Sequence, residues 1–495
     1  MKLLFVGKFP PIQGGVSMRG YWLAHRLAMA GHQVHVVTNA IEVEPSSRMF
    51  MRDRDWALCE GDYGEGKVRV HHTDPYSRRQ RHIPENNPVV TKLASLGISQ
   101  GRKIGFDAVF SFYLEPYAVA GHLISKTLGL AHIVKTAGSD TGPLLLLDQF
   151  HPLYNEVLKA AVSINTSVKA AAMMIDAGVE PDRIVIGAEF SLVEPLFQPQ
   201  GPALDIAQLI VDVNSDPVLK NSVSGIYQDG HRYLGIYGKI GRDKGTFALL
   251  RAIARLIKDG TEVGLLVLGQ SKGPDQRQFR RLVTSLELKN HVLQLPFLPH
   301  WRVPEFLRRC LAVCCLEQDF PIAHHQPVIA REVLASGTTL IASTELLSKL
   351  PHAERLIHGY NCLAVEDAKS PAKIAGKIAL LLSRPAAAEK IAARGSAYLR
   401  LQQTSNDPEN SLEAMIERAA LGRKLDRNLK TSDNDLAQMA VSALPARIKK
   451  ISTIAPPRPW GPTRGLKKSS PALMAWTRRK RCPWRFKSAP SVWKP

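Results

Sequence analysis

Residues 233–258 have the sequence YLGIYGKIGRDKGTFALLRAIARLIK. A strand-sized apolar run comes first, a turn containing glycine and lysine follows it, and apolar residues then recur at the spacing of one helix face. A strand that passes through a short turn into a helix is the repeating unit of a parallel α/β sheet. The segment therefore predicts a doubly wound α/β domain that begins with a strand over 233–237 and a helix over 245–258.

The same alternation of strands and helices extends in both directions from this segment. Towards the C-terminus, strands are expected at 263–268, 292–295, 312–316 and 339–342, and helices at 276–286, 304–310 and 328–336, with further helical segments from 371 to about 421. Towards the N-terminus, strands are expected at 3–6, 33–38, 108–111, 133–135, 162–165 and 184–186, and helices at 17–30, 118–128 and 168–177. Residues from about 45 to 105 fit this pattern poorly, so loops or irregular insertions are expected there. The fold class is α/β, with two Rossmann-like doubly wound domains that face a cleft.

The length of 495 residues exceeds what one hydrophobic core usually serves, which also favours two domains. Proline, glycine, aspartate and serine with weak periodicity follow Leu196-Phe197-Gln198-Pro199 and mark the boundary. We predict a first domain over 1–198, a linker or insertion over 199–231, a second domain with its terminal helices over 232–421 and a basic tail over 422–495.

The net charge of +21 is concentrated at the C-terminal end of the chain. Residues 446–495 contain 14 lysines or arginines, no acidic residue and four of the seven tryptophans. This composition cannot build a core and is typical of disordered segments. Basic residues interleaved with tryptophan suit an anionic membrane surface, and they also suit nucleic acid, which we consider the less favoured partner. The tail could equally be a dispensable solvated extension.

Two broad classes of protein are excluded by the remaining composition. The six cysteines form no Cys-x-x-Cys pair or regular framework, which argues against a structural zinc site or a disulfide scaffold. No apolar stretch approaches the roughly 18 to 20 residues that span a bilayer. The expected location is therefore the cytoplasm, with possible peripheral attachment to the inner face of the membrane.

The turn after the strand at 233–237 predicts an anion site. Gly238 and Gly245 allow backbone amides to approach a ligand, and the N-terminus of the following helix favours negative charge. Lys239 and Lys244 can neutralise a diphosphate. On its own, such a turn could also be a solvated lysine-rich loop.

From this turn to about Asp367, the sequence resembles the second domain of the GT-B retaining glycosyltransferases related to family 4, the group 1 type. The phosphate loop of that family has the pattern Gly-Arg, four residues, Lys-Gly; this chain has Lys239 in place of the arginine and keeps Lys244 and Gly245. The resemblance implies that these residues stabilise the leaving diphosphate of a nucleotide-sugar donor, with Lys239 and Lys244 acting in catalysis.

The donor motif of the family, two glutamates with seven residues between them, falls on His324 and Glu332. The resemblance assigns Glu332 to the ribose hydroxyls of the donor, on a helix that faces the cleft. His324 occupies the position of the first glutamate, near the donor sugar, and we include it among the catalytic candidates. Histidine can hydrogen-bond a hydroxyl or a phosphate, but it does not carry a permanent negative charge.

The N-terminal half resembles the same family more loosely. Gly14 and Gly15 precede an amphipathic helix at the position where the family's paired glycines approach the donor diphosphate. The stretch 136–140 falls at the usual His-Gly-Ser-Asp position, with Ala137 in place of the histidine. The resemblance covers roughly residues 1–400.

The sequence predicts no metal site. Asp53-Arg54-Asp55 and Asp433-Asn434-Asp435 have the Asp-x-Asp pattern of another nucleotide-sugar fold, but neither follows a buried strand, and both are expected to be solvated turns. The histidine pairs at 71–72 and 324–325 lack further ligands at metal spacing. The resemblance implies neither a metal nor a cofactor, since the nucleotide sugar is a substrate.

These patterns lead to one preferred function and two alternatives. The chain is expected to be a retaining, hexosyltransferase-like glycosyltransferase of polysaccharide biosynthesis that moves a sugar from a nucleotide-diphosphate sugar to a glycan or lipid-linked acceptor. The changes at Ala137 and His324 leave open a non-catalytic GT-B scaffold or binding protein. A sugar-nucleotide hydrolase or epimerase on a related fold is the other alternative.

Overall fold

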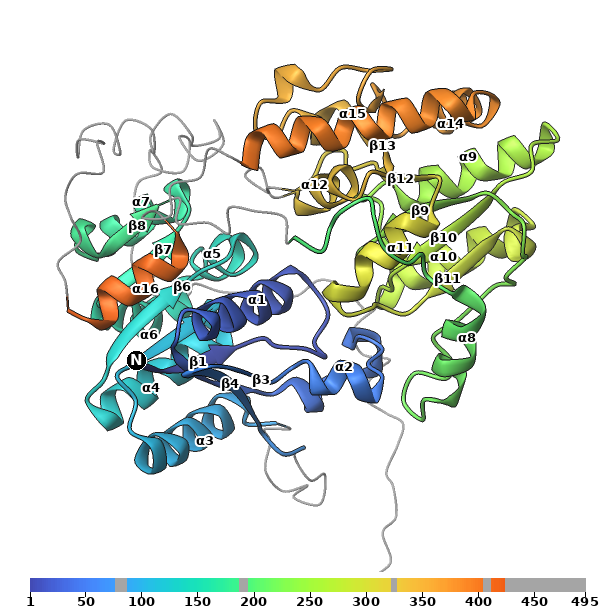
Figure 1. Cartoon of the computed structure of the whole chain (residues 1–495). Coiled ribbons are helices and arrows are strands. Elements are labelled where there is room, and N and C mark those ends of the chain that lie inside the picture. Colours follow the sequence, from blue (N-terminus) through green and yellow to red (C-terminus); the bar gives the residue numbers. More distant parts are fainter. Residues whose placement is uncertain (76–86, 187–194, 322–326, 404–410, 423–495) are drawn as a thin grey trace, which may run out of the picture. The chain divides into compact units, whose positions relative to one another are not determined.

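The structure is a computed structural model that describes residues 1–75, 87–186, 195–321, 327–403 and 411–422 (Figure 1). The chain divides into two compact units, Met1–Ala443 and Leu444–Pro495. The second unit, and with it the predicted basic tail, lies outside the described residues. Within the described part of the first unit, two separate sheets form the centres of two α/β domains.

The first domain contains an eight-stranded sheet in the order β3-β4-β2-β1-β5-β6-β7-β8. All neighbours are parallel except the antiparallel pair β3 and β4. The sequence order reverses at β1, which has β2 on one side and β5 on the other. The strands are β1 (Lys2–Gly7), β2 (Gln33–Thr38), β3 (Gly61–Tyr63), β4 (Gly66–His72), β5 (Ala108–Phe112), β6 (Ala131–Lys135), β7 (Ser163–Thr166) and β8 (Ile184–Ile186).

Helices cover both faces of this sheet, as Figure 1 shows. Alternate residues of β1 enter two different cores: Leu3 and Phe5 pack on the side of α1, whereas Leu4 and Val6 pack on the side of α3 and α4. This alternation is what a strand buried on both faces requires. The helices are α1 (Gly15–Met29), α2 (Asp53–Ala57), α3 (Val89–Ile104), α4 (Val119–Leu128), α5 (Gly138–Leu144), α6 (His151–Ala160) and α7 (Val168–Asp176).

The second domain contains a fully parallel six-stranded sheet in the order β11-β10-β9-β12-β13-β14. Here the sequence order reverses at β9. The strands are β9 (Tyr233–Tyr237), β10 (Gly264–Leu268), β11 (Val292–Leu295), β12 (Ala312–Cys315), β13 (Thr339–Ser343) and β14 (Leu363–Val365). Both doubly wound domains predicted from the sequence are therefore present.

Two cores sandwich the second sheet. One contains residues of α8, α11, α12 and α15, and the other contains residues of α9, α10 and α14. The helices are α8 (Ile206–Ser215), α9 (Thr246–Lys258), α10 (Gly273–Ser285), α11 (Val303–Arg309), α12 (Val328–Ala335), α13 (Thr344–Leu347), α14 (Pro371–Ser383), α15 (Pro385–Gln403) and α16 (Leu412–Ala420).

Residues 45–105 differ from the prediction of loops or irregular insertions. They contain α2, β3, β4 and the long helix α3. Gly97 and Gly101 lower the helix propensity of α3, but they are needed there because a Cβ at either position would overlap the side chain of Ile124 or Leu128 on α4. Close packing of α3 against α4 therefore explains these glycines, and the glycines explain why the sequence did not predict the helix.

The domain boundaries also differ from a simple division of the chain. The segment 199–231 holds α8, whose Ile206, Leu209 and Val213 are buried in a core of the second domain. The helix α16, placed by sequence in the second domain, contributes Leu412 and Met415 to a core of the first. Arg26 and His32 of the first domain bind carboxylates of α16.

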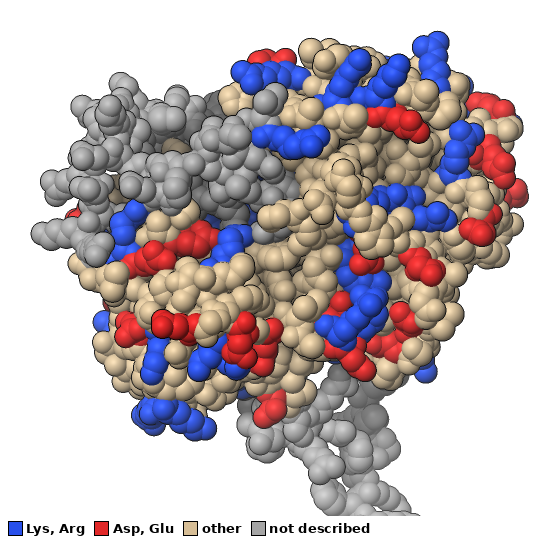
Figure 2. All heavy atoms as spheres, viewed as in Figure 1, with Lys and Arg blue, Asp and Glu red and all other residues tan. Residues whose placement is uncertain are grey.

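The surface and the cysteines agree with a protein of mixed charge and reduced thiols. Figure 2 shows cationic and anionic side chains interspersed over the visible face. Free, buried thiols are found at Cys59, Cys310, Cys314, Cys315 and Cys362. In the part of the chain that the structure describes, no helix is long and apolar enough to cross a membrane.

Candidate functional site

The turn between β9 and α9 has a backbone that requires glycine at several points. Gly238 has φ 115° and Gly245, which precedes α9, has φ 71°. A Cβ on Gly245 would overlap Leu316, and a Cβ on Gly269 would overlap the carbonyl oxygen of Gly238. The turn is thus packed closely against β10 and β12. The helix α9 begins without a capping side chain and without an acidic residue in its first turn, so its amide groups remain suited to an anion.

The two lysines of this turn have different surroundings. Lys239 is exposed and forms no ion pair with any described residue. Lys244 forms an ion pair with Glu317, and its Nζ lies 4.2 Å from the ring centroid of Phe320. The positive charge of Lys244 is therefore balanced by Glu317, whereas no carboxylate among the described residues pairs with Lys239.

Glu317 is a buried carboxylate that the sequence analysis did not single out. It is 4% exposed and lies two residues beyond the last residue of β12, at the carboxyl end of the sheet. An acidic residue directly after a buried apolar strand was the available signal, because ligands of open α/β sheets bind at this edge. His324, the predicted replacement for the first glutamate of the motif, lies outside the described residues.

Glu332 lies on α12 as predicted, but it does not face an open cleft. Its side chain is 1% exposed, and its Oε1 lies 2.7 Å from His300 Nε2. The Nδ1 of His300 accepts a hydrogen bond of 2.8 Å from the indole N–H of Trp22. His300 therefore donates from Nε2 to the carboxylate. Burial lowers the pKa of His300 to about 3, so its ring is neutral at pH 7.

The glycine pair of the first domain leaves its backbone accessible. Gly14 has φ 113° and precedes α1, whose first turn contains no acidic residue. A Cβ on Gly14 or on Gly15 would meet no other atom within 4 Å. This arrangement leaves room for a ligand next to the N-terminus of α1, and it resembles the start of α9 in the second domain.

Ala137 and Asp140 form the local structure at the position of the usual His-Gly-Ser-Asp motif. The Asp140 carboxylate accepts hydrogen bonds from the backbone N–H groups of Leu114 and Ala137, at 2.6 and 2.8 Å. Burial raises the pKa of Asp140 to about 6, although these hydrogen bonds act in the opposite direction. Asp140 therefore holds the backbone in place, and the side chain of Ala137 packs against a core of the first domain.

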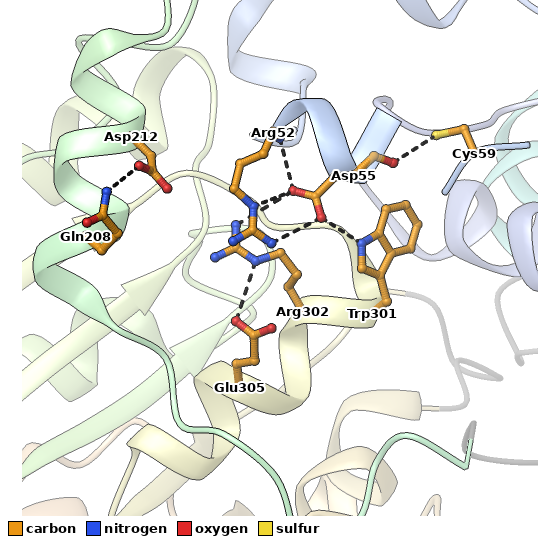
Figure 3. A network of polar contacts seen from close by, with 8 residues as sticks. All are labelled: Arg52, Asp55, Cys59, Gln208, Asp212, Trp301, Arg302 and Glu305. Atoms are coloured by element: carbon orange, nitrogen blue, oxygen red, sulfur yellow. Dashed lines mark hydrogen bonds and ion pairs between the residues drawn. The ribbon is translucent and has the colours of Figure 1, made fainter. Parts of the chain in front are cut away.

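Asp55 is not part of a solvated turn, as the sequence analysis had predicted for Asp53-Arg54-Asp55. It lies on α2, is 1% exposed and accepts hydrogen bonds from Arg52 and from the indole N–H of Trp301 (Figure 3). Arg302 lies 4.0 Å from the same carboxylate and also pairs with Glu305. Burial would raise the pKa of Asp55, but the hydrogen bonds from Arg52 and Trp301 outweigh it and lower the pKa.

Next to this cluster, each domain contributes one aromatic side chain to a core of the other domain. Phe50 belongs to a core of the second domain, and Phe297 to a core of the first. The backbone N–H of Phe50 donates to the carbonyl of Phe297 at 2.7 Å. The stretch from Phe50 to Asp55 is thus joined to the second domain by apolar packing, a backbone hydrogen bond and ionic contacts.

No group of three or more histidine, cysteine, aspartate or glutamate side chains in the described ranges is arranged to hold a metal ion. The second Asp-x-Asp triplet, Asp433-Asn434-Asp435, lies beyond those ranges. The positions that gather at the carboxyl edge of the second sheet are the glycine turn, Lys239 and the pair of Lys244 with Glu317. That set is suited to a phosphorylated ligand.

Residues 222–397 match the family described as Glycosyl transferases group 1. The match covers the second domain, including the glycine turn, Glu317 and Glu332. No curated protein sequence matches the chain.

Several solved structures have the same two-domain fold. The structure of Anabaena Alr3699/HepE in complex with UDP and glucose has a TM-score of 0.51 and 16% identity, over 81% of this chain and 95% of that chain. The UDP-glucose complex of the same protein has a TM-score of 0.51 and 14% identity, over 85% and 99%. The structure of WaaG, a glycosyltransferase involved in lipopolysaccharide biosynthesis, has a TM-score of 0.51 and 14% identity, over 85% of this chain and 100% of that chain. The fold is therefore GT-B, as predicted.

Within the segment that matches the group 1 glycosyl transferases, the structure brings Gly238, Lys239, Lys244 and Gly245 together in one turn. It adds Glu317 beside that turn and His300 beside Glu332. Sequence spacing could not reveal these two, because each reaches its partner through the fold: Glu317 is 73 residues from Lys244, and His300 is 32 residues from Glu332. The roles of the predicted residues in donor binding remain predictions.

Proposed function

We propose that this chain is a retaining glycosyltransferase that moves a hexose from a nucleoside-diphosphate sugar to a glycan or lipid-linked acceptor. The observation that carries the proposal is the glycine turn at the carboxyl end of β9. There the uncapped start of α9 and the charge of Lys239, which pairs with no described carboxylate, form a site suited to a diphosphate. The match of residues 222–397 to the group 1 glycosyl transferases supports this assignment.

The proposed chemistry needs stabilisation of the leaving nucleoside diphosphate. Negative charge develops on its terminal phosphate as the bond to the sugar breaks, and Lys239 and the amide groups at the start of α9 are suited to balance it. In this proposal Lys244 acts together with Glu317. Glu332, which is buried against His300, orients the nucleotide once its carboxylate becomes accessible. Retention follows from front-face transfer without a protein nucleophile, and closure of the two domains excludes water.

The nature of the donor is proposed from the solved structures as well. The titles of the HepE structures name UDP, glucose and UDP-glucose as bound molecules. We therefore propose a uridine nucleotide sugar as the first donor to test. We propose that the reaction requires no metal or other cofactor, and that polysaccharide biosynthesis consumes the product.

We propose that the basic tail, residues 446–495, attaches the protein to the anionic inner surface of the membrane from the cytoplasm. Fourteen cations without acidic neighbours can each gain about 1 kcal/mol near such a surface. This part of the proposal is tested by sedimentation with anionic vesicles. Removal of residues 422–495 should weaken binding to vesicles and leave nucleotide binding unchanged.

The function itself is tested with a panel of nucleoside-diphosphate sugars. A donor should first raise the melting temperature, because a ligand present at about 100 times its Kd stabilises the folded state by about 2.7 kcal/mol. Transfer of its sugar to an added acceptor, with the anomeric configuration of the product determined by NMR, then completes the test.

The alternatives give different results in the same assay. Loss of donor without an acceptor identifies a hydrolase, and a changed sugar on an intact nucleotide identifies an epimerase. Binding without turnover for every donor identifies a scaffold protein. Lys239→Met should lower transfer at least about tenfold, because a charge-assisted hydrogen bond contributes about 1.5–3 kcal/mol.

A further inference from the structure

The same dipeptide occurs at the carboxyl end of one strand in each sheet. Gly7 is the last residue of β1 and Lys8 follows it, whereas Gly238 and Lys239 are the first two residues after β9. The order of strands reverses at β1 in the first sheet and at β9 in the second. Ligands of open α/β sheets bind outside the carboxyl ends of the strands at such a reversal. Lys8 and Lys239 thus lie one and two residues beyond the carboxyl ends of the strands at which the two sheets reverse.

Lys8 is held in a defined position. Its Nζ lies 4.1 Å from the centroid of the Tyr113 ring, which follows the neighbouring strand β5. Tyr113 has φ 93°, a backbone conformation that residues with a side chain rarely adopt. Strained positions of this kind are concentrated at functional sites. The aromatic face stabilises a cation without neutralising it.

The charges of Lys8 and Lys239 oppose each other. Burial lowers the pKa of Lys8, and the positive charge of Lys239 lowers it further. Asp140 acts in the opposite direction, but its carboxylate is bound to the amide groups of Leu114 and Ala137. Neither lysine forms an ion pair with a described residue. The two cations of the different domains therefore act on each other electrostatically, and no described carboxylate forms an ion pair with either of them.

Lys244 cannot bind an anion in place of Lys8 or Lys239 without breaking its ion pair with Glu317. That carboxylate is buried, and breaking a buried ion pair is costly. An anion that enters between Lys8 and Lys239 meets no such cost, and it also relieves the repulsion between them. The site therefore favours a ligand with at least two negative charges.

We propose that Lys8 of the first domain and Lys239 of the second together bind the diphosphate of the nucleotide donor. The inference rests on the proposed function and adds to it a cation from the first domain. Lys244 then serves mainly to neutralise Glu317. Binding of the diphosphate joins the two domains through one ligand, so Lys8 contributes affinity only for nucleotides that carry phosphate groups.

The test measures binding of UDP, GDP and ADP to the full-length protein by isothermal titration calorimetry. The nucleotide that binds best, its parent nucleoside and inorganic pyrophosphate are then titrated into the variants. Lys8→Met should weaken binding of the diphosphate at least about tenfold and change nucleoside binding less than about twofold. Lys8→Arg keeps the charge and should retain most of the affinity. Lys2→Met, an exposed change on the same strand, is the matched control and should have no effect.

The possible outcomes separate this inference from the proposed function. Normal diphosphate affinity in Lys8→Met, with a loss in Lys239→Met, would overturn the inference and leave the function standing. Equal losses for nucleotide and nucleoside would show a structural effect and overturn it as well. Normal nucleotide affinity with a raised KM for the acceptor would assign Lys8 to an acceptor phosphate instead. Failure of the wild-type protein to bind any of the three nucleotides would overturn both proposals.

Discussion

The cluster around Asp55 and the lysines Lys8 and Lys239 both involve residues of the two domains, but they handle charge in opposite ways. In the cluster, the Asp55 carboxylate is surrounded by Arg52, Trp301 and Arg302, so every charge has a partner. The two lysines have like charges and no carboxylate bound to either among the described residues. The first arrangement suits permanent contact between domains, and the second suits a ligand that supplies the missing charge.

The largest effect is expected from Asp55→Ala. The substitution leaves Arg302 buried without one of its two carboxylates and removes the acceptor of the Trp301 indole. The free energy of unfolding in denaturant should fall by about 3–5 kcal/mol. The neighbouring exposed Asp53→Asn should change it by less than about 1 kcal/mol. Equal effects of the two changes would mean that the cluster contributes nothing beyond local helix structure.

The same cluster predicts a loss of stability in acid. The pKa of Asp55 is lowered in the folded protein, so its contribution is present above the unfolded-state pKa of about 3.9 and is lost as the pH falls through the folded value. Comparing wild type with Asp55→Ala between pH 6 and pH 3 isolates this contribution. The difference in stability between the two proteins should shrink towards the acid end.

A smaller loss is expected from Lys244→Met, because the buried Glu317 then loses its ion pair with Lys244. Lys244 is partly exposed, so we expect about 2 kcal/mol rather than the full effect of a buried pair. Combination with Glu317→Gln should restore part of the stability. Lys239→Met is the matched control and should alter stability by no more than about 0.5 kcal/mol. A reversed order of the two lysine variants would contradict the distinction between them.

Trp22→Phe tests the hydrogen bonds between the domains at Glu332. It removes the donor to His300 Nδ1 and should cost about 1 kcal/mol of unfolding free energy. Trp56→Phe serves as the control, since the indole nitrogen of Trp56 donates no hydrogen bond within the described ranges. Equal free energies of unfolding for the two variants would show that the Trp22 hydrogen bond does not stabilise the protein.

The smallest effect, and one of opposite sign, is expected from Lys8→Met in the absence of ligand. Removing one of two repelling cations should raise the free energy of unfolding by about 0.5 kcal/mol at low ionic strength. Because the pKa of Lys8 is lowered, this gain exists below that pKa and disappears as the pH rises through it. The gain should also fade in 1 M salt, where charges are screened within about 3 Å. A destabilised Lys8→Met protein would contradict this expectation and show that the contact of Lys8 with the Tyr113 ring outweighs the repulsion from Lys239.

The sequence predicted the sheets better than the connections between them. Strands such as 233–237 and 292–295 have the predicted bounds, because continuous apolar runs are specific for strands buried on both faces. Helix α3 was missed because its glycines serve packing against α4, a contact that local propensity cannot show. The helix in 199–231 was missed because prolines and glycines dominate the segments that flank it.

The candidate site was predictable only where its residues are adjacent in sequence. The turn from Gly238 to Gly245 could be proposed as an anion site because all of its groups lie on one short segment, and the resemblance to the glycosyltransferase family favoured that assignment over a solvated loop. Asp55 was assigned to a solvated turn because its partners, Trp301 and Arg302, are more than two hundred residues away. The burial of Glu332 against His300 likewise could not be predicted from the sequence, because it depends on the packing of α12 rather than on the motif.

The return of α16 to the first domain has a consequence for protein synthesis. A ribosome that has completed residue 198 has produced every strand of the first sheet, but Leu412, Met415 and Ile416, which fill one of its cores, have not yet been made. The apolar surface that they cover therefore remains exposed on the nascent chain while the whole second domain is translated. Folding of the first domain is completed last, although its strands emerge first, and a coding sequence cut between the domains separates the first sheet from the helix that covers it.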